Sequence, residues 1–163
     1  MVRALALTVG VLAGACAAAP TAGPAEPARI VAVVDGDTVE VSLGGRNERV
    51  RLLGIDTPET VDPDRPVGCF GPEASARTAE LLPDGTEVQL ERDAEGRDHF
   101  GRLLAYVFRA DDDTFVNEVL LAEGYAEVLV IEPNGAYAAC LRDAESAARA
   151  AGAGLWGSCP SGG

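Results

Sequence analysis

RVRLLGIDTPET, residues Arg49–Thr60, is the most informative stretch of this chain. Its apolar run is typical of a buried strand and ends in Asp56 and Glu59, on either side of a proline. Arg51 lies inside that run, where burial of its charge is costly unless an anionic group meets it. The stretch therefore predicts carboxylates at the end of a strand and an arginine close to them.

A second stretch just upstream, VVDGDTVEV (Val33–Val41), has the same organisation. Asp35-Gly36-Asp37 separates two runs rich in β-branched residues, and Gly44-Gly45 then predicts a tight hairpin into the strand that holds Arg51. Three strands in this order form a meander. Its rim gathers four acidic residues: Asp35, Asp37, Asp56 and Glu59.

The position of Gly54 carries a separate prediction. Side chains alternate between the two faces of a regular strand, so Arg51 and Asp56 would point to opposite faces. They can meet only if the strand twists or bulges, and a glycine permits this. We predict a distortion at Gly54.

The rest of the chain predicts an α+β fold, a five-stranded OB-fold Greek-key β-barrel with three α-helices. The Leu155-Trp156 pair near the C-terminus is expected to fold back as an apolar lid. The predicted strands cover residues 29–34, 38–43, 48–55, 86–92 and 103–109, the helices cover 71–82, 116–123 and 137–151, and residues 125–131 form a further strand or extended segment.

The N-terminal residues predict export. Residues 1–15 combine a basic start, an apolar run too short to span a bilayer permanently, and Ala13-Gly14-Ala15 before Cys16. The pattern favours a lipoprotein signal, with Cys16 lipidated in the cell envelope; simple cleavage after Ala15 or Ala19, giving a secreted protein, is the alternative. Residues 16–28 are rich in Ala and Pro and predict a tether. A domain over 29–157 and a tail over 158–163 follow.

The cysteines predict a disulfide rather than a zinc site. If Cys16 is lipidated, one disulfide is expected among Cys69, Cys140 and Cys159 in an oxidising compartment, with one thiol left over. The sequence does not determine which two of these cysteines form the disulfide. The spacing of these residues matches no zinc-ligand pattern.

The charge of the chain excludes a broad basic surface. There are 13 basic residues, all arginine, against 26 acidic ones, and the net charge is −13. A protein that binds nucleic acid mainly by neutralising phosphates shows a basic face. Any phosphate site in this chain must therefore be local.

The residue types at the rim favour phosphate chemistry at a metal. Asp37 and Asp56 offer hard carboxylate oxygens, which suit Ca²⁺ or Mg²⁺. Glu59 is close enough to act as a general base on water. Arg51 and Arg102 carry planar guanidinium groups that match phosphate oxygens and would stabilise the extra charge of a phosphorane.

Six motifs in order closely resemble the staphylococcal nuclease (thermonuclease) family. The resemblance covers residues 29–157 and implies an OB-fold and Ca²⁺-dependent hydrolysis of DNA and RNA. The motifs are VVDGDTVEV, RVRLLGIDTPET, CFGPEAS, RDHFGRLLAYVF, VNEVLLAEGYAEV and GLWG. The family's metal carboxylates fall on Asp37 and Asp56, its carbonyl ligand on Thr57, its proposed base on Glu59, and its phosphate-binding arginines on Arg51 and Arg102.

The resemblance does not extend to several residues that contact the substrate in the staphylococcal enzyme. A pair of tyrosines that borders the nucleotide in the staphylococcal enzyme is absent from Glu127–Glu132, which has no aromatic residue. Lysines that follow the DTPE motif there are also absent, since residues 60–68 contain two Asp and one Arg. Base stacking contributes about 1–3 kcal/mol per base, so the substrate contacts are expected to differ.

Three functions from different classes are consistent with these observations. The first is a monomeric, exported, Ca²⁺-dependent nuclease, tethered to the membrane through Cys16 or else secreted, that attacks single-stranded or flexible regions of DNA or RNA and leaves 3′-phosphate ends. The second is a non-catalytic OB-fold module that binds nucleic acid. The third is an acidic envelope lipoprotein that binds Ca²⁺ structurally.

Overall fold

The computed structural model describes residues 16, 23–60, 64 and 66–159. The predicted signal over residues 1–15, part of the predicted tether and most of the predicted tail lie outside the described residues. No helix among the described residues is long and apolar enough to cross a membrane.

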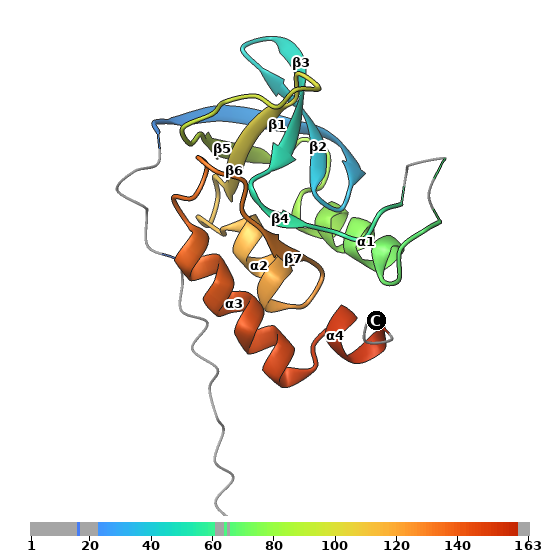
Figure 1. The fold of residues 1–163 in the computed structure, drawn as a ribbon. Helices are drawn as coiled ribbons and strands as arrows, with labels where there is room; N and C mark the ends of the chain where they lie inside the picture. Colours follow the sequence, from blue (N-terminus) through green and yellow to red (C-terminus); the bar gives the residue numbers. More distant parts are fainter. Residues whose placement is uncertain (1–15, 17–22, 61–63, 65, 160–163) are drawn as a thin grey trace, which may run out of the picture.

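The described chain is built on a closed β-barrel (Figure 1). Around the barrel the strand order is β1-β2-β3-β6-β5, and β1 closes it by pairing with β5. Strands β3 and β6 pair in parallel, and the other neighbours are antiparallel. This arrangement confirms the predicted OB-fold. The strands are β1 (Ala25–Asp35), β2 (Thr38–Leu43), β3 (Arg46–Leu52), β5 (Glu87–Glu91) and β6 (Leu103–Arg109).

Strand β1 begins four residues before the predicted start at Arg29. Residues Ala25–Arg29 pair in register with Glu91–Glu87 of β5, so this end of the predicted tether is part of the barrel. Ala and Pro composition predicted a tether there. In the structure, residues Ala25–Arg29 of this segment are instead a strand that completes the barrel.

A second, two-stranded sheet lies below the barrel. Strand β4 (Gly54–Asp56) pairs with β7 (Glu127–Leu129). The single strand predicted over residues 48–55 is therefore divided into β3 and β4. Gly54, at the division, has φ of +77°, which confirms the predicted distortion.

Helices close the core from below the barrel (Figure 1). Leu120, Leu121 and Leu141 are fully buried against the barrel side chains. Leu155 is buried as predicted for the lid, and the lid itself forms a short fourth helix. The helices are α1 (Gly71–Leu81), α2 (Val116–Ala122), α3 (Ala138–Ala151) and α4 (Leu155–Ser158).

Two disulfides use all four cysteines. Cys69 pairs with Cys159, and Cys16 pairs with Cys140 on α3, while the Cys16 backbone N–H donates to Glu118 Oε2 on α2 at 3.0 Å. The sequence predicted one disulfide and a lipid on Cys16. A sulfur that is bonded to Cys140 cannot also form the thioether of a lipid anchor, so the structure differs from that prediction.

Candidate active site

The ends of β1, β2 and β4 and one face of β3 surround a cavity of about 310 Å³, here called the acidic cavity. It contains all six residues to which the sequence analysis gave a catalytic or metal-binding role. Its lining is Val34, Asp35, Asp37, Thr38, Arg49, Arg51, Asp56, Thr57, Glu59 and Arg102.

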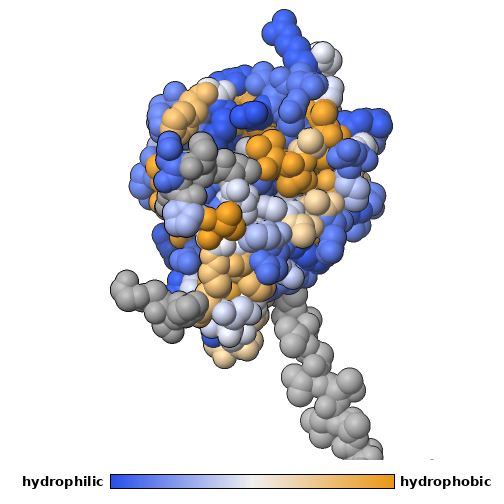
Figure 2. All heavy atoms as spheres, turned by 90° about the vertical axis from the view of Figure 1, so that its right-hand side faces the viewer, coloured by the Kyte–Doolittle hydropathy of each residue, from blue (hydrophilic) through white to orange (hydrophobic). Residues whose placement is uncertain are grey.

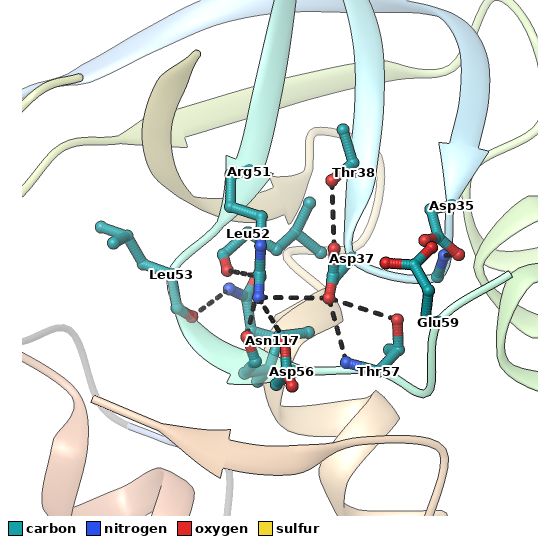
Figure 3. Close-up of polar contacts among 12 residues, drawn as sticks. Asp35, Asp37, Thr38, Arg51, Leu52, Leu53, Asp56, Thr57, Glu59 and Asn117 are labelled. Carbon is teal, nitrogen blue, oxygen red and sulfur yellow. Dashed lines mark hydrogen bonds and ion pairs between the residues drawn. The ribbon is translucent and has the colours of Figure 1, made fainter. Parts of the chain in front are cut away.

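Arg51 lies between two carboxylates of this cavity (Figure 3). Its Nη2 is 2.8 Å from Asp56 Oδ1 and 3.2 Å from Asp37 Oδ2. Its Nη1 donates to the carbonyl oxygens of Leu52 and Ile55 at 2.8 and 2.7 Å. The side chain is only 14% exposed, so these acceptors offset the cost of burying the guanidinium.

Asp37 is held by Thr57, which directly follows β4, and by its neighbour Thr38. Its Oδ2 accepts hydrogen bonds from the Thr57 backbone N–H at 3.0 Å and from the Thr57 hydroxyl at 3.2 Å, and its Oδ1 accepts from the Thr38 hydroxyl. The backbone must approach closely here, because a Cβ on Gly36 would lie 2.7 Å from Thr57 Oγ1. The glycine of the Asp-Gly-Asp motif is therefore needed for packing on Thr57.

Asn117, which the sequence reading missed, fixes the division between β3 and β4. Its side chain is fully buried on α2. Its amide group donates to the Leu53 carbonyl at 2.8 Å, and its side-chain oxygen accepts from the Val107 N–H at 3.0 Å. A polar residue among the apolar residues of a predicted helix was the available signal for this role.

Glu59 lies on the other side of Asp37 from Arg51, next to Asp35 (Figure 3). Asp35 Oδ1 accepts from the hydroxyls of Thr60 and Ser75 at 2.6 and 3.1 Å. These contacts tie the turn that carries Glu59 to β1 and to α1. They place the half-buried Glu59 carboxylate in the cavity, within the region that also holds both metal-ligand candidates.

Arg102 reaches the cavity from the start of β6 and is oriented by Asp98. Its Nε is 2.7 Å from Asp98 Oδ2, and its own backbone N–H donates to Asp98 Oδ1 at 2.9 Å. Burial raises the pKa of Asp98, but the charge and hydrogen bonds of Arg102 more than offset this, so the pKa lies below its ordinary value. The carboxylate therefore stays charged and holds the guanidinium.

Asp37 and Asp56 fit a hard divalent cation. Both carboxylates line the same cavity and lie within ion-pair distance of one Arg51 nitrogen, so their oxygens are close enough together to share an ion. Asp56 is 57% exposed, so an ion can reach it. Carboxylate oxygens in this arrangement suit Ca²⁺ or Mg²⁺.

A second hollow, of about 410 Å³, adjoins the acidic cavity and shares Arg51 and Arg102 with it. We call it the apolar groove. Leu129 and Ile131 stand on its β7 side, in the segment where the sequence lacks the tyrosines of the staphylococcal enzyme. Figure 2 shows apolar side chains gathered in a few areas of an otherwise largely hydrophilic face. The apolar groove also includes Leu52, Leu53, Ile55 and Leu104.

Comparisons with known proteins show which family this chain resembles over most of its length. A family model described as "Staphylococcal nuclease homologue" matches residues 49–158. The thermonuclease of Staphylococcus intermedius is 40% identical over 76% of this chain and 72% of its own length, and that of Staphylococcus hyicus is 37% identical over 78% and 74%. Endonuclease YncB of Bacillus subtilis (strain 168) is 43% identical over 76% of this chain and 58% of its own length.

Proposed function

This chain belongs to the staphylococcal nuclease family, and from that premise we propose that it is an exported nuclease that uses Ca²⁺ to hydrolyse phosphodiester bonds of DNA or RNA. The main support is the arrangement of the acidic cavity, where Arg51 lies between Asp37 and Asp56. Glu59 and Arg102 line the same cavity. Nuclease activity is supported by relatives that are named thermonucleases and endonucleases.

The arginines and Glu59 divide the proposed reaction between them. Arg51 and Arg102 bind the oxygens of the scissile phosphate and stabilise the charge that develops on them. The Glu59 carboxylate accepts a proton from water while the water oxygen attacks phosphorus. The bond to the 5′ oxygen breaks, that oxygen takes a proton from solvent, and a 3′-phosphate end remains.

The remaining residues hold the proposed cofactor. Asp37, Asp56 and the Thr57 carbonyl would bind Ca²⁺, which supplies positive charge against the phosphate when it is bound. The hydrogen bonds from Thr57 and Thr38 to Asp37 orient that carboxylate before any ion arrives. This preorganisation lowers the cost of bringing two carboxylates together.

The proposed substrate is single-stranded or flexible nucleic acid, bound by a monomer. The chain has a net charge of −13 and no lysine, so it has no broad basic face to hold a duplex. The acidic cavity instead concentrates its arginines at one place on the rim of the barrel. A single flexible strand can enter such a site one phosphate at a time.

A non-catalytic module of the same fold is the alternative, and the chemistry of the cavity argues against it. A protein that only binds phosphate has no need of a carboxylate positioned as a base beside the phosphate site. Glu59 is present there, and Asp35, Thr60 and Ser75 hold its turn in place.

Cleavage of end-labelled single-stranded DNA and RNA, with Ca²⁺ or with EDTA, tests this proposal. We expect Ca²⁺-dependent cleavage by the wild type, about 10²–10³-fold less by Arg51→Ala, and a comparable loss for Glu59→Gln. Glu73→Gln, an exposed carboxylate on α1, is the matched control and should cleave normally. Lack of cleavage by the wild type would overturn the nuclease proposal, and full activity of both variants would overturn the site.

Export is proposed from the sequence of residues 1–15 and is supported by two disulfides, which persist in oxidising compartments. The pairing of Cys16 with Cys140 favours simple cleavage over lipidation, because the lipid needs the Cys16 sulfur. The intact mass of the exported protein under non-reducing conditions tests this. A mass that includes a diacylglyceryl group on Cys16 would contradict it.

A further inference from the structure

Arg49 is a third arginine at the acidic cavity, and the sequence reading gave it no role. It lies on β3 two residues before Arg51, so the two side chains project from the same face of the strand, about 6.6 Å apart along it. Its cross-strand partner on β2 is Glu40, whereas Arg51 is opposite Thr38. Arg49 therefore lines the same cavity as Arg51, but one step further from the division between β3 and β4.

The three arginines of the cavity differ in their partners. Arg51 is paired with Asp37 and Asp56, and Arg102 is paired with Asp98. Among the residues that the structure describes, no carboxylate lies within ion-pair distance of Arg49, and its side chain is exposed. Of these three cations it is the one without a carboxylate at ion-pair distance in the described part of the chain, and its exposed guanidinium can contact a ligand in the cavity.

We propose that Arg49 binds a phosphate of the substrate strand next to the scissile one, so that this nuclease requires a flanking phosphate for full affinity. The inference rests on the proposed function, because it takes Arg51 and Arg102 to hold the scissile phosphate. Successive phosphates of a strand run past the cavity in a row. Two arginines on one face of β3 can contact two of them.

Such a contact would help this acidic protein to bind a negatively charged strand. Its acidic surface repels a polyanion, and the loop after the DTPE motif has no lysine to attract one. One exposed guanidinium at the entrance would give local attraction without a basic surface. Because a phosphate carries no base information, this contact adds affinity equally for all sequences.

Binding of a fluorescent single-stranded oligonucleotide at several salt concentrations, with EDTA present to prevent cleavage, tests the proposal. We expect Arg49→Ala to weaken binding about tenfold and to reduce the slope of log K against log salt by about 0.7, the value for one phosphate contact on a single strand. Arg49→Lys should restore most of the slope. Arg46→Ala, an exposed arginine on β3 outside the cavity, is the matched control.

Cleavage kinetics locate the contact. With Ca²⁺, Arg49→Ala should raise KM for the oligonucleotide and leave kcat nearly unchanged, and it should leave cleavage of a dinucleotide with a single phosphodiester unchanged. Equal losses on both substrates would place Arg49 on the scissile phosphate and overturn the proposal, as would binding and salt slope equal to the wild type. If the wild type binds but does not cleave, the proposed function fails while the Arg49 contact is still decided by the salt slope.

Discussion

Arg51 Nη2 lies 2.8 Å from Asp56 Oδ1, although side chains five residues apart on a regular strand point to opposite faces. The contact forms because the strand is interrupted at Leu53 and resumes at Gly54 with φ of +77°. Asn117 on α2 holds the interruption by donating to the Leu53 carbonyl and accepting from the Val107 N–H on β6. The ion pair of the site therefore depends on a backbone feature that is set by α2 and by the glycine.

Gly54→Ala is predicted to damage both stability and activity. A Cβ at this position would clash with Leu141 Cδ1, and the positive φ is strained for alanine. Strain of this kind costs about 1–3 kcal/mol, and overpacking adds a comparable amount. Urea unfolding should show the loss of stability, and cleavage should fall because Arg51 and Asp56 move apart.

Gly45→Ala is the control for backbone strain alone. Gly45 has φ of +82°, but a Cβ there meets no atom within 4 Å. It should lose less stability than Gly54→Ala and keep wild-type cleavage. Equal losses in the two variants would show that packing on Leu141 does not matter.

Arg51→Lys tests whether geometry or charge matters at the site. The planar guanidinium of Arg51 contacts four acceptors at once: Leu52 O, Ile55 O, Asp37 and Asp56. The ammonium group of lysine keeps the charge but cannot make all four contacts. We expect cleavage to fall about 10²–10³-fold at saturating substrate. Arg29→Lys, which alters an exposed pair with Glu87, should leave activity unchanged. Activity near the wild type in Arg51→Lys would show that a point charge is sufficient.

The sequence predicted the barrel and the convergence of Arg51, Asp37 and Asp56, because strand patterns and turn residues are local signals. The role of Asn117 depends on the contact of α2 with Leu53, which no local pattern encodes. No role for Arg49 follows from the sequence, because an arginine near the start of a predicted strand, here residues 48–55, is ordinary until its neighbours in space are known. The disulfide pairing was not predictable from local sequence either, because Cys16 and Cys140 are 124 residues apart in the chain.

Asp98→Asn should make the free energy of unfolding depend less on pH in the acidic range. The pKa of Asp98 is lowered in the folded protein, so the unfolded chain binds its proton first as the pH falls. The stabilisation is complete above the unfolded pKa, near 4, and is lost as the pH falls through the folded value. We expect Asp98→Asn to cost about 1–3 kcal/mol at pH 7 and much less at pH 3, measured by urea unfolding.

Asp111→Asn provides the comparison for Asp98→Asn. Asp111 also pairs with an arginine, but its side chain is 62% exposed, so its removal should change stability little at either pH. Cleavage by Asp98→Asn should fall as well, since Arg102 loses its orienting carboxylate. A loss of stability that is the same at pH 7 and pH 3 would contradict the charge-based explanation.

Ca²⁺ should stabilise the folded protein through Asp37 and Asp56, and this can be measured without any substrate. An ion that binds only the folded state at about 100 times its Kd adds about 2.7 kcal/mol, which thermal unfolding with and without EDTA would detect as a rise in Tm. Asp56→Asn should lose most of that rise, because one of two carboxylates is gone while the exposed position tolerates the change. Asp143→Asn, an exposed carboxylate on α3, should keep the full rise. The same increase in Asp56→Asn and the wild type would show that Ca²⁺ binds elsewhere, and the mechanism would then need a different source of positive charge beside Arg51.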